Sequence, residues 1–138
     1  MRIFKLTFYV LCLSLLMTSC KKEHKSTQMQ NVVAIHDELM PKMSTIGSLI
    51  NQLNNSSDSL QNKEAVKALK SSHNAMMMWM HDFGKDFNTD EVMRGKTLSE
   101  EKKKLLDIQE EKVSALKVQI DSSIENAKVV LNKSKNQQ

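Results

Sequence analysis

The sequence predicts an all-α protein, folded as an up-down-up antiparallel three-helix bundle with a long third helix, behind an N-terminal signal peptide. The 138 residues include only three glycines and one proline, whereas sheet-containing folds need many turns. The chain is instead rich in Lys, Glu, Gln, Met, Leu and Ala, which favour helices. Three segments also show the apolar spacing of three and four residues that is typical of amphipathic helices.

Residues 1–19 have the parts of a secretory signal peptide. Arg2 and Lys5 give a positive start, and an apolar stretch follows at 8–17. This stretch is too short to cross a membrane, which takes roughly twenty apolar residues. We therefore expect this segment to direct export and to be removed.

Cys20 is expected to carry a lipid anchor. The small residues Thr18 and Ser19 precede it, as in a lipobox, although Met17 stands where that pattern usually has Leu. Cys20 is the only cysteine after the apolar stretch, and a lone exported thiol has no disulfide partner. Acylation explains such a cysteine, and the alternative is an ordinary signal peptide with a chance cysteine near the cut.

Lipidation of Cys20 would make residues 20–28 a polar tether on a membrane and residues 29–138 a helical domain beside it. We expect an exported cell-envelope protein that its lipid anchors at the periplasmic face or in the outer membrane. The sequence does not decide between these two locations. Removal of Arg2 and Lys5 lowers the net charge from +4 to about +2, which is too balanced to indicate nucleic-acid binding.

The first predicted helix covers 29–54 and has two neighbouring apolar stripes, which together form one wide face. One stripe is Val33, His36, Met40, Met43, Gly47 and Ile50, and the other is Val32, Ile35, Leu39, Ile46, Leu49 and Leu53. Pro41 removes a backbone donor, which kinks or splits a helix. We expect a kink, because both stripes continue in phase through it. The polar run at 54–59 then predicts a loop.

The second predicted helix covers 60–87 and carries an unbroken heptad seam from Val66 to Phe87. The polar segment at 88–96 is expected to be a connector. Beside the seam, Met78 lies off the buried face, so we expect it to be exposed next to Trp79. An exposed methionine beside an aromatic residue is one candidate for a partner surface.

The third predicted helix covers 97–133. Thr97 and Glu100 have the spacing of a capping box. Apolar residues then recur every seven positions, at Leu106, Val113, Ile120 and Ala127. The extra length of this helix could project from the bundle or pair with a second copy of the chain.

Methionine and histidine concentrate on the first two helices, at spacings that place each set roughly on one face. The set is His36, Met40, Met43, His73, Met77, Met80 and His81. Thioether and imidazole groups are soft ligands that suit Cu(I), so an exported copper-binding protein is the alternative function. The competing interpretation is structural, with no cofactor, because methionine fills irregular gaps in cores.

We expect no enzyme. His36, Asp37 and Glu38 are consecutive on a helix and point to different faces, so they cannot form a triad by themselves. The sequence also has no glycine-rich phosphate loop and no nucleophile elbow.

Two short stretches resemble a family of small bacterial helical lipoproteins that is often labelled "viral A-type inclusion protein". They are the run from Ile35 to Met43 and the pattern His73-x-x-Met76-Met77-x-Trp79-Met80. The resemblance extends to 98–102 and implies a helical lipoprotein without a particular activity. We therefore expect a membrane-tethered envelope protein of interaction or structural type, which binds a protein partner or a second copy through its helix seams.

Overall fold

The computed structural model describes residues 27–56 and 59–135, which hold four helices and no strand. The prediction of an all-α chain is confirmed. The helices are α2 (Thr27–Asn54), α3 (Leu60–Asp86), α4 (Thr89–Met93) and α5 (Glu100–Lys135). The predicted signal peptide and Cys20 lie outside the described residues. None of the described helices combines the length and apolar character that a membrane crossing requires.

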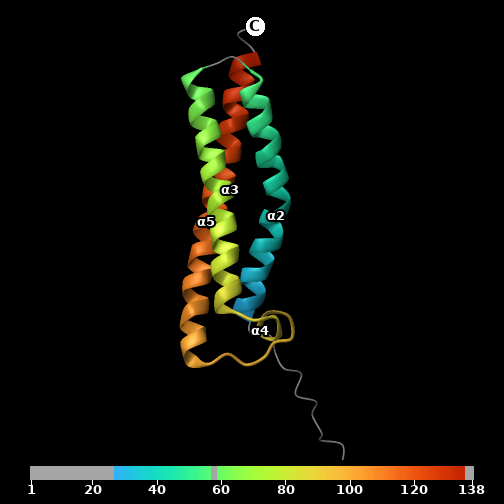
Figure 1. The fold of residues 1–138 in the computed structure, drawn as a ribbon, viewed down its shortest axis with the longest axis vertical. Coiled ribbons are helices and arrows are strands. Elements are labelled where there is room, and N and C mark those ends of the chain that lie inside the picture. Colours follow the sequence, from blue (N-terminus) through green and yellow to red (C-terminus); the bar gives the residue numbers. More distant parts are fainter. Residues whose placement is uncertain (1–26, 57–58, 136–138) are drawn as a thin grey trace, which may run out of the picture.

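The three long helices lie side by side, and each contacts the other two (Figure 1). Two contacts fix the antiparallel register of α2 and α3. Nδ2 of Asn62 donates to the carbonyl oxygen of Leu53 at 3.5 Å, and the rings of His36 and Trp79 lie 6.1 Å apart between centroids. Within each pair, the two residues lie equally far along the chain from the middle of the α2–α3 loop. Residues of α2 and α3 at equal distances from that loop therefore lie level with one another.

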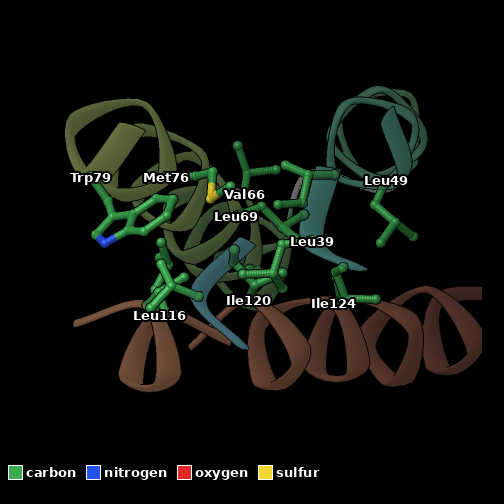
Figure 2. Close-up of a cluster of buried hydrophobic side chains, with 14 of the residues drawn as sticks. Leu39, Leu49, Val66, Leu69, Met76, Trp79, Leu116, Ile120 and Ile124 are labelled. Carbon is green, nitrogen blue, oxygen red and sulfur yellow. The ribbon is translucent and has the colours of Figure 1, made fainter. Parts of the chain in front are cut away.

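The core is built from apolar residues of all three long helices, which meet in the space between them (Figure 2). The heptad positions predicted for the third helix are each at most 1% exposed, namely Leu106, Val113, Ile120 and Ala127. Leu39 of α2 and Leu69 of α3 are equally inaccessible and face Ile120. Burial of one such large side chain contributes roughly 1.5–3 kcal/mol, so this layer supplies much of the stability.

α2 passes through Pro41 as one helix, so the proline does not split it, and Figure 1 shows a gentle bow. Pro41 is exposed on the side away from the core, where a helix that curves around a core is convex. Of the two predicted stripes, the one that contains Leu39 faces the core. The stripe that contains His36 borders α3 and is partly exposed.

The connector predicted at 88–96 contains a helix that the prediction missed, because α4 is too short to show periodicity. A capping box starts it: Oδ1 of Asn88 accepts from the backbone N–H of Glu91 at 3.1 Å, and Oε2 of Glu91 accepts from the N–H of Asn88 at 2.9 Å. The same carboxylate lies 2.7 Å from Nζ of Lys102. α4 is thereby fastened to the first turn of α5.

The cap predicted for the third helix is wrong by two residues, and the helix itself begins at Glu100. Ser99, rather than Thr97, caps α5, since its Oγ accepts from the backbone N–H of Lys102 at 3.3 Å. Both residue types are good caps, and the chain stays non-helical through Leu98, which packs against the core. The helix also extends two residues beyond the predicted end, to Lys135.

Candidate functional site

An apolar hollow of about 310 Å³ lies between α2, α3 and α4. α2 contributes Val33, His36 and Asp37, α3 contributes Trp79, Met80, Phe83 and Gly84, and α4 contributes Val92 and Met93. Hollows of this size, mostly apolar and with a few polar groups at the edge, are the common form of a binding site. It is the place where residues from both the predicted methionine–histidine set and the missed helix α4 come together.

One wall of the hollow is aromatic and firmly held. The ring of Trp79 stacks on Phe83 at 5.1 Å, and Phe83 lies 5.0 Å from Phe87. Nε1 of Trp79 donates to the backbone carbonyl oxygen of Gln109 at 3.3 Å, which fixes the indole to α5. Trp79 is only 6% exposed, so it forms the floor of the hollow rather than its rim.

His36 stands at the rim of the hollow with one ring nitrogen already paired. Its Nδ1 lies 2.9 Å from Oδ1 of Asp37, and its ring lies over the Trp79 side of the hollow at 6.1 Å between centroids. In the tautomer that this contact favours, Nδ1–H donates to the carboxylate and Nε2 keeps its lone pair. With a side chain 29% exposed, His36 is open to a ligand from solvent.

The structure divides the predicted methionine–histidine set. His36 and Met80 line the hollow. Farther along the same α2–α3 seam, the register places Met43 nearly level with His73, and both are partly buried. Met40 and Met77 are also nearly level, at 37% and 39% exposed.

His81 lies outside the hollow. It is exposed, and its Nδ1 lies 3.4 Å from Oδ1 of Asp82. The prediction missed Met93, which joins His36 and Met80 only because α4 folds back toward α2. Among residues 27–56 and 59–135, no group of three or more His, Cys, Asp or Glu side chains is placed to hold a metal ion. Methionine is not among these residue types, but its thioether sulfur can also bind a metal, and the two methionines Met80 and Met93 line the hollow.

A cluster of ion pairs joins α2 to α5 on the surface. Nζ of Lys42 lies 2.5 Å from Oδ1 of Asp121, and Lys117 pairs with Glu38. The hydrogen bonds from Lys117 and then Lys42 hold the pKa of Glu38 below its usual value, and the bond to Asp121 raises the pKa of Lys42. Each shift favours the charged form, whereas a general acid or base needs a pKa near the working pH. The cluster therefore has the character of a structural ion-pair network.

Comparisons with known proteins gave no match to this chain among family models, curated proteins or solved structures. The family resemblance stays a prediction, and the chemistry of the hollow is inferred from its own residues.

Proposed function

We propose that this chain is an exported lipoprotein of the bacterial cell envelope, in which Cys20 carries the lipid and an up-down-up three-helix bundle acts as a non-catalytic interaction or structural module. One observation carries the proposal. Cys20 follows a positive segment, an apolar segment and two small residues, and it is the only cysteine left after cleavage at that point. Several acyl chains on one cysteine bind a membrane far more stably than the single chain that gives marginal binding.

The position of α2 supports a short tether. The helix begins at Thr27, so only the residues between Cys20 and Thr27 separate the lipid from the bundle. A fully extended segment of this length reaches at most about 25 Å. The bundle would therefore stand close to the membrane, with the start of α2 and neighbouring α4 at the near end (Figure 1).

Met78 supports the interaction part of the proposal. It is 68% exposed, as the sequence predicted, and with Ala75 and Leu116 it lines a shallow groove between α3 and α5. Methionine is common at surfaces that adapt to different partners, because its unbranched side chain can change shape. A partner protein would approach this face while the lipid holds the N-terminal end of the chain at the membrane.

Metabolic labelling with an alkyne-bearing fatty acid tests the lipid anchor. The full chain, Cys20→Ser and Cys12→Ser are expressed in a bacterial host and compared for label, intact mass and membrane association. We expect the wild type to be labelled, cut before Cys20 and found with membranes. Cys20→Ser should lose the label and keep its leader, because acylation precedes cleavage in lipoproteins.

Cys12→Ser is the matched control. It removes the other cysteine of the chain, which lies within the apolar stretch and would be discarded. This variant should be labelled and cut like the wild type. An unlabelled wild type, or label that persists in Cys20→Ser, would contradict the proposal.

A further inference from the structure

We infer that the hollow between α2, α3 and α4 is a binding site for one Cu(I) ion, with His36, Met80 and Met93 as ligands. This goes beyond the proposed function and does not depend on lipidation. The three side chains come from three different helices and line the same hollow of about 310 Å³. One imidazole and two thioethers form a neutral, soft ligand set, which suits Cu(I) better than Mg²⁺, Ca²⁺ or Mn²⁺.

His36 is oriented as a metal-binding histidine usually is. Its Nδ1 lies 2.9 Å from a carboxylate oxygen of Asp37, which favours the proton on Nδ1 and leaves Nε2 as the donor to the ion. Carboxylates commonly hold ligating histidines in this way, and they raise the basicity of the ring. Asp37 is thus a positioning residue, and it balances the charge that Cu(I) brings.

The surroundings favour a soft monovalent ion. Val33, Phe83 and Val92 line the hollow with hydrocarbon, which limits the access of water and of hard oxygen ligands. The indole of Trp79 forms the floor, with its ring centroid 6.1 Å from that of His36. A cation held by this imidazole lies close to the indole, whose face attracts cations.

The side chains of Met80 and Met93 are flexible enough to move toward a bound ion. Met93 is 61% exposed and Met80 is partly buried, and each side chain has three rotatable bonds. The hollow is wider than an ion, so Met93 is expected to swing inward when Cu(I) binds. Met80, packed between α2 and α3, changes less.

The experiment is an anaerobic competition between the protein and a chromophoric Cu(I) chelator. The full chain carries Cys12→Ser and Cys20→Ser, so no thiol competes for the metal, and it is purified in detergent. Trp79 is the only tryptophan, so its fluorescence reports on the hollow itself. We expect one Cu(I) per chain, with quenching of Trp79 in proportion to the metal transferred. His36→Gln, Met80→Leu and Met93→Leu should each weaken binding at least tenfold.

His81→Gln and Met78→Leu are matched controls, because both residues are exposed, lie on α3 and are outside the hollow. They should leave the affinity unchanged, while circular dichroism verifies the fold of every variant. The inference is overturned if Cu(I) is not withdrawn from the chelator, or if His36→Gln and Met93→Leu bind as tightly as the parent. It is also overturned if His73→Gln or Met77→Leu abolishes binding instead. Uptake of an apolar dye that Cu(I) does not displace would assign the hollow to apolar ligands.

Discussion

Nε1 of Trp79 donates a hydrogen bond to the backbone carbonyl oxygen of Gln109 at 3.3 Å, and so joins α3 to α5 through a buried polar contact. The indole also stacks on Phe83, 5.1 Å away. Trp79 therefore stabilises the fold both by packing on Phe83 and by a hydrogen bond to α5. Substitutions of different size can separate these two contributions to the free energy of unfolding.

Trp79→Phe should lower the free energy of unfolding by about 1–2 kcal/mol, because it removes the hydrogen bond and part of the ring but keeps an aromatic side chain. Trp79→Ala should cost about 3–5 kcal/mol, because it also opens a cavity. Urea unfolding followed by circular dichroism measures both. Equal losses in the two variants would show that packing on Phe83 contributes nothing measurable.

The fold was predictable where burial follows a repeat. Residues every seven positions on one helix must share a face, and this places Val113 and Ile120 in the core without knowledge of the neighbours. The position of a helix end depends instead on which of several nearby residues acts as the cap. Thr97 and Ser99 are both able to cap, and in the structure it is Ser99, the residue after the core-packed Leu98, that does so.

The candidate site was predictable only in part, because it depends on tertiary contacts. His36 and Met80 share the seam that the sequence indicated. Met93 joins them through α4, a helix of five residues whose capping box is visible in the sequence but whose attachment to α5, through the Glu91–Lys102 ion pair, is a tertiary contact. No spacing rule connects residues 36 and 93, so their meeting could not be read from the sequence.

Pro41→Ala should stabilise the protein by about 1–2 kcal/mol. Pro41 lies inside α2 and is exposed, so the alanine loses no core contact and restores a backbone N–H where the helix can use it. The gain is smaller than the roughly 3 kcal/mol helix penalty of proline, because proline also restricts the unfolded chain. Thermal and urea unfolding measure the change. A loss of stability would mean that the shape Pro41 gives to α2 is needed for packing on α5.

A double-mutant cycle should show coupling between Ser72 and Ser123. Oγ of Ser72 donates to Oγ of Ser123 at 3.0 Å, and Ser123 donates to the carbonyl oxygen of Ile120 at 2.9 Å. Both serines are buried, so Ser123→Ala alone leaves a buried hydroxyl without this partner and should cost about 1–2 kcal/mol. Replacement of both by Ala removes the polar groups together, so the double variant should cost less than the two single costs added. Strict additivity in urea unfolding would show that the bond contributes no coupling energy.

Acid should weaken the attachment of α4 to α5 through Glu91. The hydrogen bond from Lys102, and then that from the backbone N–H of Asn88, lowers the pKa of Glu91 below the ordinary glutamate value of 4.5. A lowered folded-state pKa means that the unfolded chain takes up the proton first as the pH falls. The stabilisation by Glu91 is therefore complete above about pH 4.5 and declines as the pH falls through the lower pKa of the folded state.

Glu91→Gln should cost about 1–3 kcal/mol at pH 7, since the amide loses the charged bond to Lys102. As the pH falls below about 4.5, protonated Glu91 comes to resemble glutamine, so the difference between the two proteins should narrow. Urea unfolding at a series of pH values measures that difference. Glu100→Gln is the control, because Glu100 is exposed and its pair with Lys103 lies within one helical turn, so its cost should stay under about 0.5 kcal/mol at every pH. If the Glu91→Gln difference stayed constant down to the pH of acid unfolding, the carboxylate charge would not be what holds α4 to α5.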